Sequence, residues 1–512
     1  MAFLACNVIC LSPVHDDLRG WNKNIKTQVL KGNVEKAILT YLNMQELGYH
    51  ADNYTFPILL KAAGNLLNSC FGCSLHGVTI KTGFSSHAFV QTALLNMYSS
   101  LGFICDACKV FENMPVKDVV AWNSMLDAYV SSGQMDNATE IFESMPLKDL
   151  SSFNIMVSGY GSTGRIISAR SIFNKIPTKD AVSWNTMILA YTNAGDMAEA
   201  QKLFNKMPAK NVITWNTMVR GYIHNQLYAE AVDLFDEMQA GNVMPDFLTM
   251  TGVLSACAHL GSLERGTKIH IYAKSHCLDS SPHVTTALIV MYAKCGSIVN
   301  ALVVFYKFQF KDIYCWNAII SGLALHGYGN AALGLFDKMR ENCIMPDDIT
   351  FIGLLSACSH AGLVKDGCKL FNCMEKVFGI TPKREHYGCM VDLLGRAKLL
   401  NHAFQLIQAM PFEPGESVLG ALLSACVINR DLDTGEKVMK LYFDRSSSHF
   451  SDGELMMFAN LYASCGKWEE AKMWREKMND SGIAKTAGCS IIELNGNFHK
   501  FLAGEIGIDL KP

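Results

Sequence analysis

Four copies of one sequence pattern, between Val119 and Asp246, constrain the fold more than any other feature of the chain. The copies read VVAWNSMLDAY, LSSFNIMVSGY, AVSWNTMILAY and VITWNTMVRGY. Each contains an aromatic residue followed by Asn, and these residues, Asn123, Asn154, Asn185 and Asn216, are 31 positions apart each time. Self-similarity at a short fixed period indicates a stacked repeat array and not one globular core.

Each copy has the periodicity of two short helices. In residues 182–194 the apolar side chains recur at i, i+3, i+4 and i+7, which predicts a helix with one apolar face. Gly195 is expected to end this helix in the left-handed conformation, Asp196 to cap a second helix, and Pro208 to prevent its continuation. Two such helices cannot bury their apolar faces alone, so neighbouring copies must stack. The sequence therefore predicts an all-α fold, a right-handed superhelical solenoid of helix-turn-helix hairpins.

Composition limits the possible functions. The chain has 512 residues, of which 50% are hydrophobic and 18% charged, and its formal net charge is -3. These values are typical of a folded chain. The sequence contains no uninterrupted apolar run of about eighteen residues, so no membrane span is predicted. A protein that binds nucleic acid mainly through a phosphate field is usually basic. Any RNA contact must therefore depend on side chains at set positions and on local basic patches.

The eighteen cysteines predict buried thiols rather than disulfides or metal sites. Cys257, Cys358 and Cys426 each follow Ser-Ala, in positions where a small core residue would fit. Two pairs, Cys70/Cys73 and Cys105/Cys108, have the spacing of zinc knuckles, but both fall within expected second helices and not in turns. No metal site and no cofactor are predicted.

Outside the central copies the spacing of the pattern alternates. From Asn22 to Asn123, and again from Asn216 to Asn317, the interval is 101 residues, which divides into 35, 35 and 31. The wording agrees between corresponding segments, since TALLNMYSSLG at Thr92 returns as TALIVMYAKCG at Thr286. This pattern resembles the plant pentatricopeptide repeat (PPR) proteins of the long-and-short-repeat (PLS) subfamily. Tetratricopeptide arrays keep a constant 34-residue period.

The tail also resembles this family. GALLSACVINRDLDTGE from Gly420, and the segment from Ala459 to Glu505, are similar to the extension motifs that follow the last repeat, called E1, E2 and E+. Leu419 stands where the family usually has Trp, and Lys398 where Gly is commoner. The resemblance implies an N-terminal segment at 1–17, about twelve repeats over 18–414, helical extension motifs over 415–505 and a tail at 506–512. The DYW deaminase domain that ends some relatives is expected to be absent.

The Asn after each aromatic residue, and the last residue of each repeat, are the candidate base-reading residues. Stacking would bring them together along one edge, and both can hydrogen-bond with the Watson-Crick edge of a base. In the family, Asn with Asp favours uridine, Thr with Asp guanosine, and Asn with Asn a pyrimidine. Carried over, this implies uridine at Asn22/Asp52, Asn123/Asp149, Asn154/Asp180, Asn216/Asp246 and Asn317/Asp347, guanosine at Thr92/Asp118 and Thr286/Asp312, and a pyrimidine at Asn185/Asn211.

The remaining repeats are expected to read poorly or not at all. Their residue pairs are Pro57/His87, Thr251/Ser281 and Ile352/Lys383, of which Thr251 and Ser281 are kept as weaker RNA contacts. Apolar residues such as Val120, Val182 and Ile213 would sandwich the base, while the tryptophans belong to the core. The alternative interpretation is that Asn, Thr and Asp occupy these positions only because helix caps and turns favour them.

The sequence contains no recognisable active site. A zinc deaminase needs His-x-Glu and Pro-Cys-x-x-Cys, and neither occurs. The resemblance therefore implies a non-enzymatic, single-stranded RNA-binding protein of a plant organelle, which selects a cytidine for C-to-U editing. It would recruit a DYW-type deaminase in trans, together with small editing co-factors, and needs no membrane or small-molecule substrate. The alternatives are transcript splicing or stabilisation with the same RNA readout, and a protein-binding scaffold.

The expected location is the mitochondrion, with the chloroplast as the alternative. Residues 1–17 contain neither Arg nor Lys and end in two acids, which makes a poor transit peptide.

Overall fold

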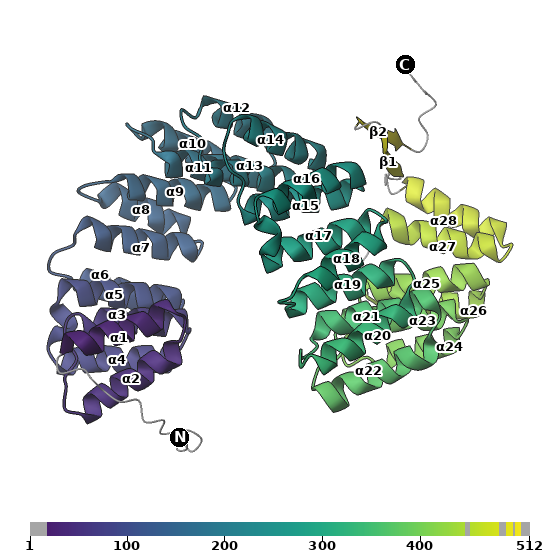
Figure 1. Ribbon diagram of the computed structural model, residues 1–512, viewed down its shortest axis with the longest axis horizontal. Coiled ribbons are helices and arrows are strands. Elements are labelled where there is room, and N and C mark those ends of the chain that lie inside the picture. The colour runs from purple at the N-terminus through teal and green to yellow at the C-terminus, as the bar shows by residue number, and fades with distance from the viewer. Residues whose placement is uncertain (1–17, 446–450, 481–487, 495–496, 503–512) are drawn as a thin grey trace. The chain divides into compact units, whose positions relative to one another are not determined.

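The structure is a computed structural model that describes residues 18–445, 451–480, 488–494 and 497–502. The expected N-terminal segment at 1–17 and the tail at 506–512 lie outside the described residues. The chain divides into two compact units, Met1–Asn225 and Gln226–Pro512. Figure 1 shows that each unit is built from short helices in chain order.

The first unit consists of helical hairpins whose first helices stack in a row. Contacts join α1 to α3, α3 to α5, and so on to α13, while each second helix packs on its own first helix. The helices are α1 Leu18–Leu30, α2 Val34–Glu46, α3 Thr55–Asn65, α4 Ser69–Lys81, α5 Ala88–Ser100, α6 Ile104–Glu112, α7 Val119–Ser131, α8 Met135–Ser144, α9 Leu150–Ser162, α10 Ile166–Lys175, α11 Ala181–Asn193, α12 Met197–Lys206 and α13 Val212–His224, with a short 3-10 turn at Phe84–Ser86.

The second unit repeats this plan, with the first helices stacked in order from α15 to α27. Its helices are α14 Tyr228–Ala240, α15 Phe247–Leu260, α16 Leu263–Ser275, α17 Pro282–Lys294, α18 Ile298–Lys307, α19 Ile313–Leu325, α20 Gly329–Glu341, α21 Asp348–Ala361, α22 Val364–Phe378, α23 Arg384–Arg396, α24 Leu400–Gln408, α25 Glu416–Asn429, α26 Leu432–Arg445, α27 Asp452–Ser464 and α28 Trp468–Asp480, with a 3-10 turn at Leu278–Ser280.

The predicted boundaries of the central hairpin agree with the structure. Helix α11 ends at Asn193, and Gly195 follows with a φ of 80°, the left-handed conformation that glycine adopts easily. The side chain of Asp196 accepts a hydrogen bond from the backbone N–H of Glu199 and so caps α12. Lys398 also has a positive φ, 62°, at a position where the family usually has Gly, so this turn is strained.

A two-stranded antiparallel sheet follows α28, in a segment for which only helix was expected. Strands β1 (Cys489–Leu494) and β2 (Asn497–Leu502) pair with Cys489 opposite Leu502. CSIIEL and NFHKFL contain β-branched and aromatic residues, and Asn-Gly stands between them in the sequence, a dipeptide favoured in hairpin turns. The local pattern therefore outweighs the helical period of the preceding repeats.

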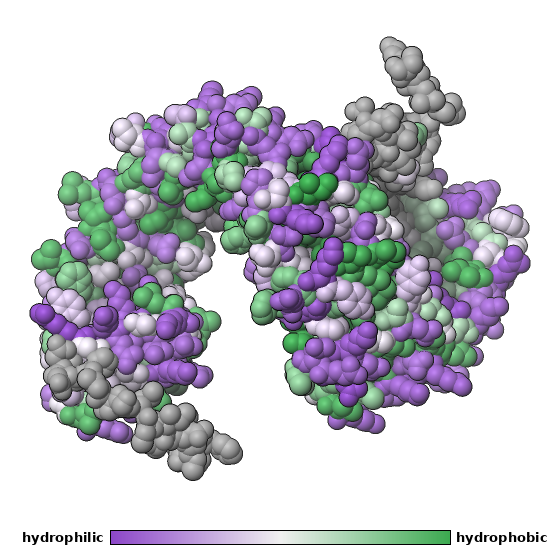
Figure 2. All heavy atoms as spheres, in the orientation of Figure 1, coloured by the Kyte–Doolittle hydropathy of each residue, from purple (hydrophilic) through white to green (hydrophobic). Residues whose placement is uncertain are grey.

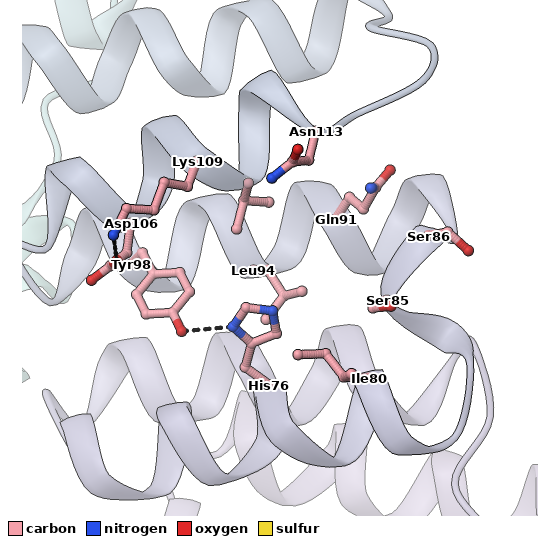
Figure 3. Close-up of a pocket in the computed structure, with 11 residues that line it drawn as sticks. His76, Ile80, Ser85, Ser86, Gln91, Leu94, Tyr98, Asp106, Lys109 and Asn113 are labelled. Atoms are coloured by element: carbon pink, nitrogen blue, oxygen red, sulfur yellow. Dashed lines mark hydrogen bonds and ion pairs between the residues drawn. The ribbon is translucent and has the colours of Figure 1, made fainter.

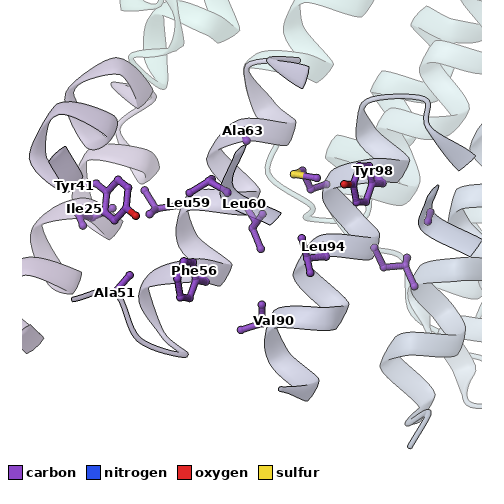
Figure 4. Packing of buried hydrophobic residues seen from close by; sticks show 14 of the residues in the cluster. Ile25, Tyr41, Ala51, Phe56, Leu59, Leu60, Ala63, Val90, Leu94 and Tyr98 are labelled. Carbon is purple, nitrogen blue, oxygen red and sulfur yellow. The ribbon is translucent and has the colours of Figure 1, made fainter. Parts of the chain in front are cut away.

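The core of the first unit is formed where consecutive hairpins meet. Ile25, Phe56, Leu59, Leu60 and Val90 are fully buried, and they come from α1, α3 and α5. Figure 4 shows these side chains in one continuous row that passes from helix to helix. Each hairpin thus completes the core of its neighbour, as expected of a repeat array.

Most aromatic residues that precede the candidate Asn residues contribute to the core of their own unit. Trp21, Trp215 and Trp316 are buried, and Trp122 and Trp184 meet the ring edges of Phe111 and Phe173. The expectation that these tryptophans are core residues is confirmed. Leu419, which stands in place of the family's Trp, is fully buried as well.

Cys257, Cys358 and Cys426 are buried as expected. The expectation of buried thiols is wrong for five others, which are exposed: Cys70, Cys73, Cys105, Cys277 and Cys343. The Cys70/Cys73 pair lies in α4 and the Cys105/Cys108 pair in α6. Among the described residues, no group of three or more His, Cys, Asp or Glu side chains is arranged to hold a metal ion. In the same part of the chain, every helix is too short or too polar to cross a lipid bilayer.

Candidate nucleic-acid interface

Asn123 and Asp149 form the central contact of the candidate interface. Asn123 lies in α7, while Asp149 is the N-cap residue of α9, the first helix of the next repeat. The Asn123 side chain donates from Nδ2 to Asp149 Oδ1 over 3.0 Å. We call such a set of three residues a junction. Its first member is the Asn or Thr of one repeat, its second is the last residue of that repeat, and its third lies three positions after the second.

The third member of this junction is Ser152. Its backbone N–H donates to Asp149 Oδ1 over 2.9 Å. Its hydroxyl donates to Asn123 Oδ1, the nearer oxygen at 2.6 Å, and lies 2.9 Å from Asp149 Oδ1. The same hydroxyl accepts from the backbone N–H of Asp149, which completes a capping box. The carbonyl end of the Asn123 amide therefore faces the hydroxyl and its amino end faces the carboxylate.

Two further junctions have the same network. Asn22 donates to Asp52 Oδ1 over 3.2 Å, and the Thr55 hydroxyl donates to Asn22 Oδ1 over 2.7 Å. In the second unit, Asn317 donates to Asp347 over 3.0 Å, and the Thr350 hydroxyl lies 2.6 Å from Asn317 Oδ1. We call these three, at Asn22, Asn123 and Asn317, the tied junctions.

At two of the tied junctions, hydrogen bonds favour the ionised carboxylate. Burial alone would raise the pKa of Asp149, but hydrogen bonds from Asn123 and Ser152 outweigh it, so this pKa lies below its usual range. The pKa of Asp52 is lowered in the same way, by bonds from Thr55, Tyr54 and Asn22 that outweigh burial. Both residues therefore act as hydrogen-bond acceptors at neutral pH.

Two junctions have the predicted residues but a different network. At Asn154/Asp180 the backbone N–H of Ser183 is the main cause of a lowered Asp180 pKa, with smaller contributions from the Ser183 hydroxyl and Asn154. Asn154 Oδ1 itself is buried with no partner. At Asn185/Asn211, the Thr214 hydroxyl bonds Asn211, and Asn185 Oδ1 is likewise buried without a partner. We call these the untied junctions.

The two Thr junctions are built differently again. Thr92 donates to the Ala88 carbonyl of its own helix, and Ala121 occupies the third position. Thr286 lies 3.2 Å from the Sγ atom of Cys315, whose backbone N–H donates to Asp312. Burial raises the pKa of Cys315 to about 11, so this thiol stays protonated at neutral pH. No hydrogen bond joins Thr to Asp directly at either of these described junctions.

The other predicted pairs are less well defined. Asn216 belongs to the first unit and Asp246 to the second, so their pairing stays a prediction. Thr251 bonds the Leu248 carbonyl of its own helix, and no hydrogen bond joins it to Ser281 in the described part of the chain. Lys383 forms an ion pair with Asp348.

A groove opens beside Thr92 and Asp118, between α3, α5 and α7. Its volume is about 580 Å³, and Phe89 and Val120 also line it, with 69% and 60% of their surfaces exposed. Each is the second residue of a first helix, the position assigned to base sandwiching. Val182 and Ile213, which the sequence placed in the same role, are exposed too. Figure 2 shows apolar side chains interspersed with polar ones on the visible face of each unit.

Sequence reasoning missed several residues of this groove. Phe89 is the second residue of the repeat that contains Thr92 and Asp118, and its position in the helix could have identified it. Lys61 and Asp127 also line the groove, and burial raises the pKa of Asp127. No repeated sequence signal marks these two residues, because they depend on how neighbouring hairpins stack.

The lysine before several junctions supports the loop rather than facing a ligand. Lys117, Lys148, Lys179 and Lys210 each donate to a backbone carbonyl three residues earlier. Each ammonium group also lies 5.0–5.3 Å from the centre of a phenylalanine ring. These lysines stabilise the turn before the next helix, because their ammonium groups interact with a backbone carbonyl and an aromatic ring of the protein itself.

A pocket of about 350 Å³ on the second-helix side contains none of the predicted base-reading residues. Figure 3 shows His76 and Tyr98 meeting across it, with a distance of 2.7 Å between His76 Nδ1 and the Tyr98 hydroxyl. His270 and Tyr292 form the same contact at 2.8 Å. Since the contact recurs between repeats, it serves stacking.

Comparison with known sequences identifies the family. A pentatricopeptide repeat-containing protein of Arabidopsis thaliana is 48% identical over 484 residues, which cover 94% of this chain and 80% of that protein. The chain belongs to the pentatricopeptide repeat family. A second such Arabidopsis protein is 36% identical over 470 residues, or 92% of this chain and 77% of its own length. A third, described as chloroplastic, is 44% identical over 258 residues, 50% of this chain and 47% of that protein.

Family models match the PPR array and its extension. Residues 179–212, 210–259 and 311–360 match the PPR repeat family, and 120–150, 151–180 and 349–377 match the PPR repeat. Residues 447–493 match the E motif. The resemblance inferred from the repeats and the tail is therefore confirmed.

Solved structures confirm the PPR solenoid fold. The crystal structure of the pentatricopeptide repeat protein PPR10 from maize has a TM-score of 0.56 and 20% identity, covering 92% of this chain and 74% of that one. PPR10 in complex with an 18-nt psaJ RNA element has a TM-score of 0.54 and 20% identity, covering 91% and 70%.

Proposed function

We propose that this PPR protein binds single-stranded RNA in a plant organelle, reads its bases through the junctions, and selects a cytidine for C-to-U editing. The observation that carries the proposal is the Asn123, Asp149 and Ser152 network, which recurs at Asn22 and Asn317. Sequence-specific RNA recognition commonly targets unstacked bases, which helical repeats read one at a time. The solved complex of PPR10 with an RNA element supports the same use of this fold.

The atoms of a tied junction suit the edge of uracil. Asn123 Oδ1 is engaged by the Ser152 hydroxyl and one Nδ2 hydrogen by Asp149, which leaves the other Nδ2 hydrogen as a donor. The second carboxylate oxygen of Asp149 takes no part in these bonds and can accept. Uracil presents an N3–H donor next to carbonyl acceptors, whereas cytosine presents an N3 acceptor next to an amino donor. The junction therefore complements uracil and opposes cytosine.

The charge of the protein favours this kind of recognition over phosphate binding. Its net charge is -3, and the groove beside Thr92 contains Lys61 together with Asp118 and Asp127. Proteins that neutralise many phosphates lose affinity steeply as salt rises. We expect a shallow dependence of RNA affinity on salt concentration, because few cations face the RNA.

The editing role rests on the E motif at 447–493. In this proposal the array holds the nucleotides upstream of the edited cytidine, with its N-terminal repeats toward the 5′ side. A DYW-type deaminase acts in trans, recruited through the extension with the help of small editing co-factors, so the PPR protein itself performs no catalysis. We assign the mitochondrion as the location, with the chloroplast as the alternative that one chloroplastic relative supports.

RNA binding is tested with the purified full chain. The matched RNA has uridine, any base, guanosine, uridine, uridine, a pyrimidine, uridine, any base, guanosine and uridine, in 5′ to 3′ order. We expect this RNA to bind at least tenfold more tightly than a scrambled RNA of equal composition, since each well-read base contributes about 1–3 kcal/mol. Equal affinities would contradict base reading and favour a protein-binding scaffold.

Editing is tested by sequencing organellar transcripts of a plant that lacks the protein. The proposal expects one or a few cytidines to lose editing, each just downstream of a sequence that fits the junction order, while splicing and transcript levels are unchanged. Normal editing together with a splicing or stability defect would leave the RNA readout in place but contradict the editing role.

A further inference from the structure

The residue at the third position of a junction depends on whether its first residue is Asn or Thr. Every candidate junction that begins with Asn has Ser or Thr at the third position. The two junctions that begin with Thr have neither residue there. The hydroxyl residues are Thr55, Ser152, Ser183, Thr214, Thr249 and Thr350, and the exceptions are Ala121 and Cys315. All eight side chains are fully buried.

Helix capping alone does not account for this match. Asp118 caps α7 through the backbone N–H of Ala121, at 2.8 Å, and Asp312 caps α19 through the backbone N–H of Cys315, at 2.9 Å. Both helices therefore begin correctly without a hydroxyl at the third position. What these junctions lack is an Asn amide, whose carbonyl oxygen needs a donor when it is buried.

We propose that the buried hydroxyl at the third position of a tied junction sets base specificity by occupying the carbonyl oxygen of the base-reading Asn. The inference rests on the proposed RNA readout and adds Thr55, Ser152 and Thr350 to it as positioning residues. They touch no base, because they are fully buried.

The mechanism follows from what an amide can offer. A free Asn side chain can donate from Nδ2 or accept at Oδ1, so it can pair with a keto base or with an amino base such as cytosine. When Ser152 donates to Asn123 Oδ1, the side chain is held at both ends, with its carbonyl oxygen turned toward the buried hydroxyl and its amino group toward Asp149. The amide then presents its Nδ2–H to the base, beside the second carboxylate oxygen of Asp149. Uracil places O4 opposite this donor and N3–H opposite the carboxylate, whereas cytosine in the same position would place its amino group against the donor and its N3 against the carboxylate.

The untied junctions provide the contrast within the same unit. Ser183 has the same position, residue type and burial as Ser152, and its hydroxyl also lies 2.8 Å from the carboxylate of its cap residue. The carbonyl oxygen of Asn154 nevertheless has no partner. Removal of the Ser183 hydroxyl therefore weakens a cap without releasing an amide.

The test compares Ser152→Ala, Ser152→Thr and Ser183→Ala in the full-length protein. For each, affinity is measured for the matched RNA and for RNAs in which the uridine at the fourth position, which faces Asn123, or at the fifth position, which faces Asn154, is replaced by cytidine. Ser152→Ala should reduce the uridine-over-cytidine ratio at the fourth position about fivefold, the size of one hydrogen bond. Ser152→Thr should retain the ratio. Ser183→Ala should change the ratio at the fifth position by less than about twofold, because no amide is released.

The outcomes separate this inference from the proposed function. If the unmodified protein binds matched and scrambled RNA equally, the proposed function fails. Two outcomes would contradict the positioning role while the unmodified protein still discriminates between the RNAs. In one, Ser152→Ala keeps the uridine-over-cytidine ratio of the unmodified protein. In the other, Ser152→Ala and Ser183→Ala reduce this ratio equally, and capping then explains the hydroxyl. Thermal unfolding checks that each variant folds. Should Ser152→Ala not fold, Thr350→Val and Thr350→Ser at the tenth position repeat the comparison.

Discussion

The junctions at Thr92 and Asn123 are neighbours in the chain, and each has an Asp as its cap residue. Their buried hydrogen bonds nevertheless differ. At Asn123 the amide, the carboxylate of Asp149 and the Ser152 hydroxyl form a closed hydrogen-bond network. At Thr92 the hydroxyl donates to its own helix, and Ala121 fills the third position. In the proposed readout, the first residue of a junction and its buried third residue form one unit, which must change together.

The largest effect is expected when both variable members of one junction are exchanged. Asn123→Thr with Ser152→Ala converts the Asn123 junction into the Thr92 type. We expect its preference at the fourth nucleotide to move from uridine to guanosine, with a change of about tenfold or more in the ratio of the two affinities. Titration with RNAs that differ only at this nucleotide measures it. An unchanged preference would show that the two junction types do not differ in readout.

The next effect concerns stability. Ser152→Ala leaves the Asn123 carbonyl oxygen without its donor and removes half of a capping box, so it should lower the free energy of unfolding by about 1–2 kcal/mol. Ala121→Ser, the reverse change at the Thr92 junction, should alter stability by less than about 0.5 kcal/mol, because no amide waits there for a donor. Urea denaturation of both variants measures the difference, and equal losses would argue against a network specific to Asn.

A smaller effect is expected in acid. The pKa of Asp149 is lowered in the folded protein, so its network contributes stability above the ordinary Asp pKa of about 3.9 and loses it as the pH falls through the folded value. The unmodified protein should therefore lose more stability than Ser152→Ala between about pH 5 and pH 3. Denaturation midpoints at several pH values test this, and parallel curves would contradict the assigned role of Ser152 in lowering the pKa.

The smallest effect is expected at the other Thr junction. Cys315→Ser places a hydroxyl beside Thr286, where there is no amide oxygen to occupy. Base preference at the ninth nucleotide should stay within about twofold of the unmodified protein, well below the value of one hydrogen bond. A strong shift toward another base would mean that the third residue acts on Thr junctions too.

The sequence was sufficient to predict the hairpins and most members of the junctions, because repetition makes weak local signals consistent. Three local roles recur along the chain. The aromatic residue before each Asn packs in the core, Gly195 ends a helix and Asp196 caps one. The hairpin β1–β2 was not predicted, because it occurs once and follows a helical array whose period ends before Cys489.

The parts of the site that the sequence could not supply depend on contacts between repeats. Ser152 looks like an ordinary capping residue until the structure places its hydroxyl against Asn123, which is 29 positions earlier. The groove that contains Lys61, Phe89 and Asp127 likewise draws on three helices. Neither arrangement has a periodic pattern of its own that reveals which side chains meet.

The most direct test of base reading is a scan of the matched RNA, in which each nucleotide is replaced in turn and the affinity of the full chain is measured. We expect loss of affinity when uridine becomes cytidine at the Asn/Asp junctions and when guanosine becomes adenosine at the Thr/Asp junctions, with little change at the two positions that face Pro57/His87 and Thr251/Ser281. A flat profile, or losses that do not follow the order of the junctions, would contradict the account.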